Sequence, residues 1–576
     1  MLKILRQPLL YLLLLLIAAF FWVIPEKPRI DHVILTMNGV SEEKTLPVTG
    51  IPAHTDFTVS FDLELKKGEK PAYKIIPDDC ITGIEINGKP FPQARLGNPC
   101  DYTHGMELDF SEWTVAGTNQ IVFKNRNHGG PGGLKINPIS NGFSSVHFKQ
   151  ILFSVLLILV ISLILRKFNF SRTAVLLVIL GVAVRLVYST YTDAFTRVYD
   201  VLGHLEYINI IADESRLPAV GETWSSNHPP LYYLIGAAIK KAAPEHFEYL
   251  LVQFALLLSF VSVAFGAGFL QEIFARRRFL LLSGLLFVLW PGFVICATRI
   301  GNDVPAYFGM FMCIYYAQKW WKYGGTKFML LATLGAALGI MFKSTGFAVA
   351  GAWCLIWLLG TVRTFKIGSL KALALCFLMA VISLAAAQGR TLIAAVQGEK
   401  TYIANTTSVN PALRVENKIG NYLYFDAKEY LTEPYMDTYN DKGGRQYFIN
   451  SFIKSSLFGE YRVWNSLAGV NLALLIALVT LPLLALFLFG MLSGNKNLVP
   501  AALFFFTLLA SLLANRALYP LSCMQDVRYI MPVILPMCAF IMHGANQISH
   551  PSLRKSAYAC MGLFSLLSLI FILGQA

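Results

Sequence analysis

The sequence predicts a polytopic α-helical membrane protein of about 13 spans that carries an extracytoplasmic β-sandwich domain near its N-terminus. Of its 576 residues, 55% are hydrophobic and only 14% are charged, whereas soluble domains carry about a quarter charged residues. Apolar runs of about 17–25 residues recur along the chain, which is the length that crosses a bilayer. Residues 26–147 instead show short, partly alternating runs that are typical of strands.

The positive charges between the apolar runs orient the predicted spans. Lys3 and Arg6 precede the first span, which places the N-terminus inside, and each later short inside loop also carries Lys or Arg. Three long segments then lie outside, at about 25–148, 191–247 and 390–465. The net charge of +14 is thereby explained without a nucleic-acid partner. The spans are expected near residues 5–24, 149–165, 173–190, 248–271, 279–296, 304–318, 328–342, 345–361, 369–389, 466–490, 498–515, 529–547 and 556–573.

These spans divide the chain into four parts. We expect a transmembrane anchor at 1–25, the β-sandwich at 26–148, a second span with its cytoplasmic loop at 149–172, and a helical region at 173–576. The first span resembles a signal peptide, but no convincing small-residue cleavage site follows it, so we interpret it as a retained anchor.

The predicted β domain contains runs such as "FTVSFDLEL" and "NQIVFKN", separated by turns such as "NG" and "KKGE". Its stretch from "ITGIEINGKPF" to "MELDFSEWTVAGTNQIVFKN" resembles the galactose-binding-like jelly-roll modules. The resemblance implies the fold and leaves open either sugar binding or a role in packing and acceptor positioning. Cys80 and Cys100 lie here, in a compartment that permits disulfides, and they are a candidate disulfide pair. The other seven cysteines lie in or beside apolar spans.

Polar residues gather where the third predicted span ends. The segment "DVLGHLEYINII" at 200–211 predicts a short helix on which Asp200 and His204 share a face. The loop "RLPAVGETWSSNHPP" follows, and its two prolines begin the helix "LYYLIGAAIKKAA". That helix is too short to span a bilayer, and its tyrosines and lysines suit a membrane interface.

These segments resemble the glycosyltransferase-C class, which includes the protein O-mannosyltransferases and the lipid A aminoarabinose transferases. Three later segments add to the resemblance: "ATRIGNDVPAYF" at 297–308, "LGIMFKSTGFAV" at 338–349 and "QDVRYIMPVILP" at 525–536. The resemblance extends from about residue 173 to 547. It implies a transferase that moves a sugar from a polyprenyl-phosphate donor to a glycan, lipid or protein acceptor. It also implies an active site on the extracytoplasmic face of the cell's inner, or cytoplasmic, membrane.

The resemblance assigns the chemistry to carboxylates. Asp200 is expected to be the base that takes a proton from the acceptor hydroxyl in a single, inverting displacement. Asp193 is the alternative base, and either carboxylate could instead be an ordinary loop or helix-cap residue. Asp303 is expected to orient the acceptor or the base, although an acidic residue at a helix N-terminus can also serve as a cap.

Three residues are expected to bind the donor phosphate: Lys343, Arg528 and His228. A charge between two apolar spans is costly and often functional, but Lys343 could also extend to the membrane interface. Arg528 could instead pair with Asp526. The histidine before the double proline matches the mannosyltransferases, whereas the aminoarabinose transferases have lysine there, which leaves the role of His228 open.

His204, Tyr232 and Glu460 complete the expected substrate contacts, and His204 could also be a hydrogen-bond partner of Asp200 or an ordinary interfacial histidine. Oligosaccharyltransferase-type enzymes bind a divalent ion, and Asp200, His204 and Asp303 could in principle do so. The chain has no D-x-D or H-E-x-x-H motif, so we expect no cofactor and no required metal.

Two other functions fit parts of the pattern. A transporter or flippase of lipid-linked sugars would also need an apolar groove for the lipid and cationic residues at the edge of the membrane. It would normally place broken polar segments at the membrane midplane and show paired repeats, whereas the polar motifs here collect at one face. A non-catalytic glycan-binding or assembly protein would explain the β domain but not the carboxylates and cations.

Overall fold

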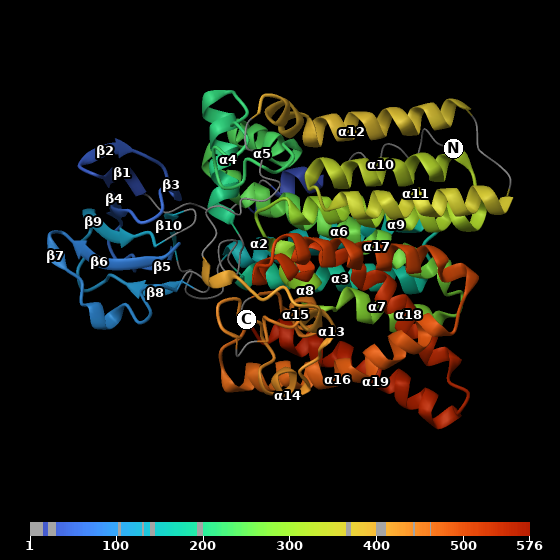
Figure 1. Ribbon diagram of the computed structural model, residues 1–576. Helices are drawn as coiled ribbons and strands as arrows, with labels where there is room; N and C mark the ends of the chain where they lie inside the picture. The colour runs from blue at the N-terminus through green and yellow to red at the C-terminus, as the bar shows by residue number, and fades with distance from the viewer. Residues whose placement is uncertain are drawn as a thin grey trace.

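The computed structural model describes residues 15–20, 23, 30–101, 105–128, 132–138, 145–192, 200–364, 370–398, 411–441, 444–460 and 462–575. A β domain lies at one end of a body of long helices, next to the short helices α4 (Val201–Glu214) and α5 (Leu231–Ala242), as Figure 1 shows. The helical body extends away from the β domain, so the functional segments predicted at the edge of the membrane lie near the boundary between the two.

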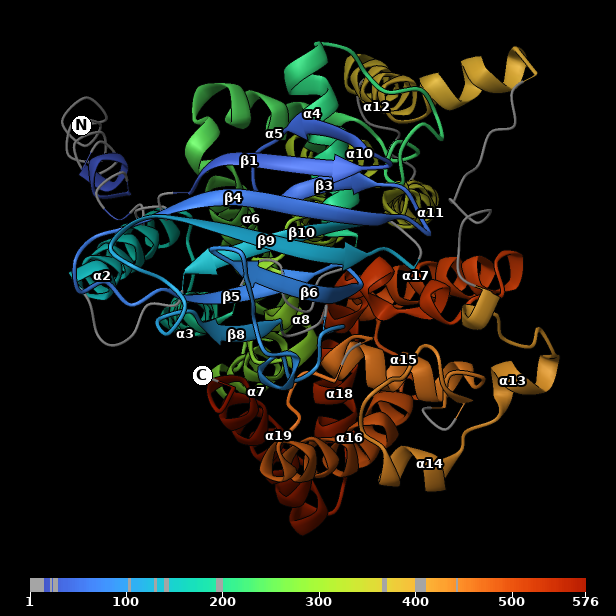
Figure 2. The ribbon, with the colours of Figure 1, turned by 90° about the vertical axis from the view of Figure 1, so that its left-hand side faces the viewer.

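The described strands of the β domain form two antiparallel sheets (Figure 2). One has six strands in the order β2-β1-β4-β9-β6-β7, and the other has four in the order β3-β10-β5-β8. The strands are β1 Ile30–Met37, β2 Val40–Glu43, β3 Val48–Ile51, β4 Asp56–Leu65, β5 Ala72–Pro77, β6 Cys80–Ile86, β7 Lys89–Pro90, β8 Met106–Asp109, β9 Gly117–Arg126 and β10 Gly132–Pro138.

The two sheets share one hydrophobic core. Alternate residues of β4, such as Val59 and Phe61, are buried, as the two-residue period of a strand requires. They join Leu134 from the other sheet in a single cluster. The expected disulfide between Cys80 and Cys100 is confirmed. The domain is therefore two packed antiparallel sheets, and the specific jelly-roll topology stays a prediction.

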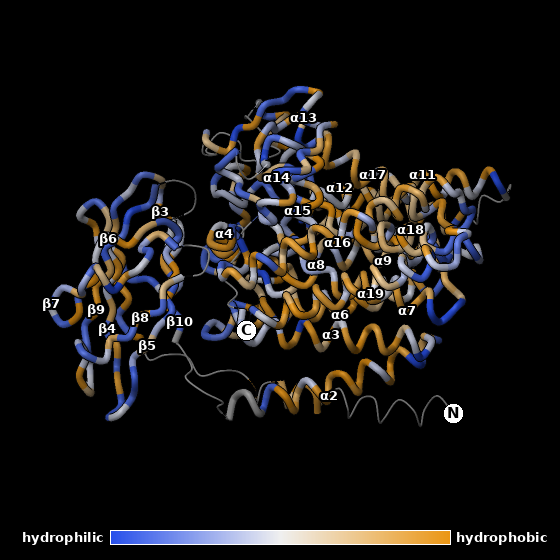
Figure 3. Tube along the Cα trace, turned by 90° about the horizontal axis from the view of Figure 1, so that it is seen from below, coloured by the Kyte–Doolittle hydropathy of each residue, from blue (hydrophilic) through white to orange (hydrophobic). Residues whose placement is uncertain are grey.

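The helical body contains long, apolar helices and several short ones (Figure 3). The helices other than α4 and α5 are α2 Ser145–Lys167, α3 Arg172–Tyr191, α6 Phe247–Ile273, α7 Arg277–Val288, α8 Pro291–Ile295, α9 Asp303–Tyr323, α10 Thr326–Phe342, α11 Gly346–Thr364, α12 Leu370–Val396, α13 Ile419–Leu423, α14 Ala427–Thr432, α15 Phe448–Phe458, α16 Leu467–Leu492, α17 Val499–Leu518, α18 Ile534–Gln547 and α19 Pro551–Leu573.

Nine helices in the described part of the chain are long and apolar enough to cross a membrane, or ten if one bent pair counts as a span. The protein is thus a multi-pass membrane protein. Helix α9, predicted as a span, is not among them, and α10 has only 17 residues. The predicted span at 5–24 lies largely outside the described residues, so the number thirteen stays a prediction.

One predicted span, 279–296, is not a single helix. It breaks into α7 and α8 with a bend of 55°, because Trp290 is extended and Pro291 begins the second helix. The buried Arg185 of α3 stabilises this break by donating hydrogen bonds to the carbonyls of Val288 (3.2 Å) and Phe293 (3.4 Å). Backbone groups that leave a helix inside a membrane need such partners.

Candidate active site

Asp200 lies immediately before α4 in a strained conformation. Its backbone angles, φ 54° and ψ 23°, are left-handed, which costs a non-glycine residue about 1–3 kcal/mol and is often retained at functional sites. Its side chain makes no helix-cap hydrogen bond, so the carboxylate is not a helix cap. The alternative base, Asp193, lies outside the described residues.

Arg528 lies between carboxylates. Its Nη2 is 3.9 Å from Asp200 Oδ2, and its Nε is 3.6 Å from Asp526 Oδ2. The side chain of Arg528 is only 8% exposed, and that of Asp200 is 34% exposed. The expected alternative, a pair with Asp526, is therefore present, but it does not keep Arg528 away from Asp200.

Lys343 and Asp303 form a second, largely buried ion pair. Lys343 Nζ lies 2.5 Å from Asp303 Oδ1, at the C-terminal end of α10 and the first residue of α9, respectively. The Lys343 ammonium lies 5.0 Å from the centre of the Tyr529 ring, and the Arg528 guanidinium lies 4.9 Å from it. The two cations expected to bind phosphate thus flank one tyrosine. Lys343 is held by a carboxylate and does not reach out to the interface.

Two buried histidines adjoin these ion pairs. His204 Nδ1 lies 2.9 Å from the hydroxyl of Tyr233, and the His204 ring lies 5.9 Å from that of His228 and 6.2 Å from that of Tyr232. Burial lowers the pKa of His204 well below its usual value and lowers that of His228 to about 3. Both rings are therefore neutral at pH 7, and each can offer a ligand an N–H group but no charge.

Glu460 joins the group from the segment that precedes α16. Its side chain is buried, and burial together with Asp526 and Asp200 raises its pKa well above the usual range, opposed by Arg528. Glu460 thus shares the electrostatic environment of Asp200 and Arg528.

A narrow hollow lies beside His204 and Asp303, the carboxylate of the second ion pair. Its wall consists of His204, Arg299, Ile300, Gly301, Asp303 and Val304. A Cβ atom at Gly301 would come within 3.2 Å of His204 Nε2, so glycine keeps the backbone close to the ring. The neighbouring Asn302 is fully buried, and in the described part of the chain neither polar atom of its side chain has a hydrogen-bond partner.

Sequence reasoning missed Arg299, Asn302 and Arg390 as members of the site. Arg299 and Asn302 lie within the segment quoted for Asp303, where a cation and an amide close to an acidic residue were a usable sequence signal. The structure shows that both side chains are buried. Arg390 of α12 carried no local signal. Its guanidinium donates hydrogen bonds to the Tyr207 hydroxyl (2.6 Å) and to the carbonyls of Pro218 (2.6 Å), Ser226 (2.9 Å) and His228 (3.2 Å).

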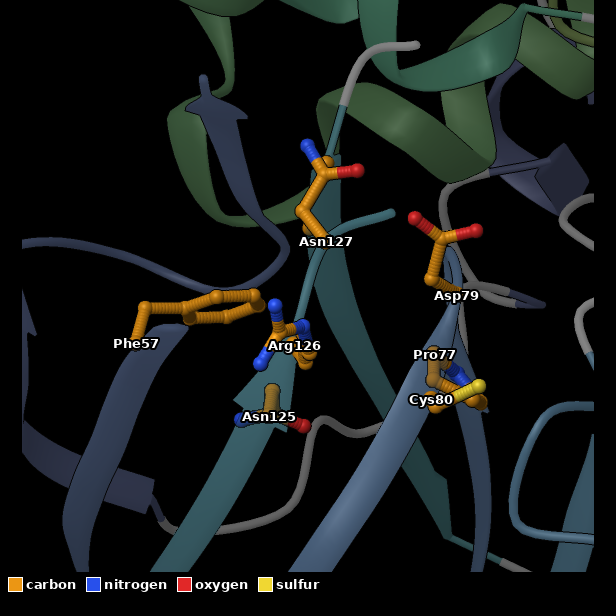
Figure 4. Close-up of a pocket in the computed structure, with 9 residues that line it drawn as sticks. Phe57, Pro77, Asp79, Cys80, Asn125, Arg126 and Asn127 are labelled. Atoms are coloured by element: carbon orange, nitrogen blue, oxygen red, sulfur yellow. The ribbon is translucent and has the colours of Figure 1, made fainter. Parts of the chain in front are cut away.

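A second, shallow hollow lies in the β domain (Figure 4). Figure 4 shows Phe57, Asn125 and Arg126 on one side of it and Pro77 and Cys80 on another, with Asp79 and Asn127 above them. Sugar binding by the β domain stays a prediction.

Across the described ranges, no group of three or more His, Cys, Asp or Glu side chains is placed to hold a metal ion. Asp200, His204 and Asp303, considered from the sequence as a metal set, do not form such a group there. The charges instead alternate between cations and carboxylates: Arg528 with Asp200 and Asp526, and Lys343 with Asp303.

The fold and these ion pairs define a multi-pass membrane protein with a charged site at one end of its helical body. No family model and no curated protein matches the chain. Among solved structures, the chain is similar to ArnT from Cupriavidus metallidurans bound to undecaprenyl phosphate, with 15% identity and a TM-score of 0.37. The apo state of that protein gives 15% identity and a TM-score of 0.36. Each match covers 66% of this chain and 61% of the other, so the chain spans about three fifths of its length.

Proposed function

We propose that this protein is a membrane glycosyltransferase of the glycosyltransferase-C class, which moves a sugar from a polyprenyl-phosphate donor to an acceptor hydroxyl on the extracytoplasmic side. The observation that carries the proposal is the geometry of Asp200. A strained, partly exposed carboxylate lies 3.9 Å from a buried arginine, and that arginine shares Tyr529 with a buried lysine. One end of the site thus supplies a proton acceptor, and the other supplies cations that suit an anionic leaving group.

The donor would contact both the apolar membrane helices and the charged site of the helical body. Its isoprenoid chain is apolar enough to lie among the membrane helices, and its phosphate would bind Lys343 and Arg528. A planar guanidinium can hold two phosphate oxygens at once, whereas an ammonium acts as a point charge. Asp303 and Asp526 would keep the two cations in place before the donor arrives.

In the proposed reaction, the acceptor oxygen attacks the anomeric carbon while Asp200 takes the hydroxyl proton. The bond between that carbon and the phosphate oxygen breaks, and its electron pair leaves with the phosphate, which Lys343 and Arg528 stabilise. A positioned base contributes about 10²–10⁴ in rate to such a step. A single displacement of this kind inverts the anomeric configuration.

The remaining residues would bind the sugar and hold the site together. The neutral rings of His204 and His228 can each donate one hydrogen bond to a sugar or phosphate oxygen, and Tyr232 and Glu460 would add polar contacts. We propose that this reaction needs no metal, because two cations already meet the leaving group. Activity that persists in excess EDTA would support this part of the proposal, and activity lost to EDTA and restored by a divalent ion would refute it.

Purified protein in lipid nanodiscs or vesicles, supplied with a radiolabelled polyprenyl-phosphate sugar, tests the function. We expect label to become covalently attached to a hydroxyl acceptor in the wild type but not in Asp200→Asn. A series of hexosyl and pentosyl donors would identify the sugar. Label that crosses the bilayer without forming a new bond would indicate a flippase. Label that stays bound to the protein as intact donor would indicate a binding protein.

A further inference from the structure

The four-stranded sheet of the β domain has an outer face that packs on the helical body. In strand β10, Leu134 and Ile136 point into the core of the β domain, so Gly133 and Lys135 lie on the opposite face. Lys135 is paired in register with Ile76 of β5. Ile76 is buried in the hydrophobic cluster of the helical body and not in that of the β domain. We call Gly50, Ile76, Gly133 and Lys135 the docking face.

The docking face contacts α4 at two glycines. A Cβ atom added to Gly133 would lie 2.7 Å from Leu202 Cδ1, and one added to Gly50 would lie 3.4 Å from Glu206 Oε1. Leu202 and Glu206 are four residues apart, so one face of α4 lies against the sheet. Leu202 is also only two residues from Asp200.

A largely buried ion pair joins the same sheet to α6. Lys135 Nζ lies 3.2 Å from Glu248 Oε2 in α6, and the two side chains are 10% and 13% exposed. A buried ion pair contributes little net stability, but loss of one partner leaves a charge without compensation and is strongly destabilising. Removal of either partner should therefore disturb how the sheet packs on the helices.

We propose that the docking face holds α4 in place and thereby positions Asp200, so that Leu202, Lys135 and Glu248 are positioning residues for the transfer reaction. The idea rests on the proposed function for its effect on catalysis, but not for the docking itself. Asp200 has left-handed backbone angles, and a strained residue persists only where its surroundings fix it. Asp200 directly precedes α4, so α4 and the sheet packed on it constrain its backbone on the C-terminal side.

The buried ion pair allows a matched test in the full-length protein. Lys135→Met and Glu248→Met each break the largely buried ion pair and keep only one of its two charges, whereas the double variant removes both charges and can regain packing. We expect each single variant to speed amide hydrogen exchange in α4 and to lower kcat by about 10–100-fold, the cost of a small misplacement of a reacting group. The KM for the donor should change little, because Lys343 and Arg528 lie outside the docking face. The double variant should recover both readouts.

Leu202→Ala provides a second test that leaves the β domain and its ion pair unchanged. It should also speed exchange in α4 and lower kcat. Gly83→Ala in β6 is the control, because its new Cβ atom would meet only Lys124 Cδ at 3.8 Å. Unchanged exchange in all single variants would overturn the docking. Faster exchange with an unaltered kcat would overturn the positioning. A wild type without transfer activity would instead refute the proposed function, while the exchange data would still decide the docking.

Discussion

Lys343 Nζ lies 2.5 Å from Asp303 Oδ1, which joins the end of α10 to the start of α9 across 40 positions of sequence. Neither side chain is more than 14% exposed, so each depends on the other for neutralisation. A donor phosphate that binds Lys343 would therefore share it with a carboxylate. Lys343 would thus have two roles, because it neutralises Asp303 in the folded protein and would bind the donor phosphate in the reaction. The two roles can be tested separately.

Lys343→Met should destabilise the protein by about 3–5 kcal/mol, because Asp303 is left buried and unpaired. The double variant Lys343→Met/Asp303→Asn should regain most of the lost thermal stability but not the transfer activity. Differential scanning fluorimetry and a radiolabelled donor assay measure the two effects. If the double variant transferred sugar at the wild-type rate, Lys343 would have no part in the reaction.

Asp200→Asn should retain expression and donor binding, yet lose transfer by about 10²-fold or more, because an amide cannot accept the hydroxyl proton. Asp213→Asn is the matched control, since Asp213 lies on the same helix and is 61% exposed beside Lys240. Asp193→Asn tests the alternative base and should be much milder than Asp200→Asn. The reverse ranking would move the base to Asp193.

The contact between α4 and the β domain should weaken as the pH rises. Burial, with a smaller effect of Glu222, raises the pKa of Glu206 from 4.5 to about 7. The stability from this shift is complete below the unfolded pKa near 4.5 and is lost as the pH rises through about 7. Thermal unfolding midpoints between pH 5 and 9 should therefore fall less in Glu206→Gln than in the wild type. Glu64→Gln, an exposed change in β4, should keep the wild-type slope.

Arg390→Lys and Arg390→Met should disturb the loop between α4 and α5. A guanidinium reaches the four oxygens around Arg390, whereas an ammonium has a different geometry and fewer donors. Each lost hydrogen bond from a charged donor costs about 1.5–3 kcal/mol. We expect thermal stability and transfer to fall in the order wild type, Arg390→Lys, Arg390→Met. Equal values for the lysine variant and the wild type would show that the fork geometry is not needed.

The proposed orientation places the β domain outside the cell membrane. His128→Cys, at the first position of the glycine-rich segment 128–133, should react with an impermeant thiol reagent in intact cells or spheroplasts. Arg276→Cys, in the predicted inside loop immediately before α7, is the control and should react only after the membrane is opened. The opposite pattern would reverse the topology.

Sequence patterns predicted the features that depend on local periodicity. The apolar helices, the strands of the β domain and the pairing of Cys80 with Cys100 all followed from hydropathy, alternation and compartment. The residues nominated for the site also lie near one another, including the Asp200–Arg528 and Lys343–Asp303 pairs. Their roles in a reaction stay predictions.

Long-range partners could not be predicted in the same way. Arg390 is 183 positions from Tyr207, and Lys135 is 113 positions from Glu248, so no local pattern links either pair. The bend between α7 and α8 was missed because its apolar composition is continuous, whereas the backbone geometry at Trp290 and Pro291 is not. The role of Gly133 likewise depends on a neighbour that only the fold brings to it.

The docking face also imposes an order on biogenesis. Lys135 is synthesised 113 residues before Glu248, an interval of roughly 6–23 s at a translation rate of about 5–20 residues per second. During that interval the β domain can fold around its own core, but the helical surface that covers Ile76 and Lys135 is still incomplete, because α6 has not been made. A newly made chain thus exposes an apolar and charged patch that the mature protein hides. Conditions that slow synthesis or insertion of the later helices should therefore favour aggregation or proteolysis of this protein before its assembly is complete.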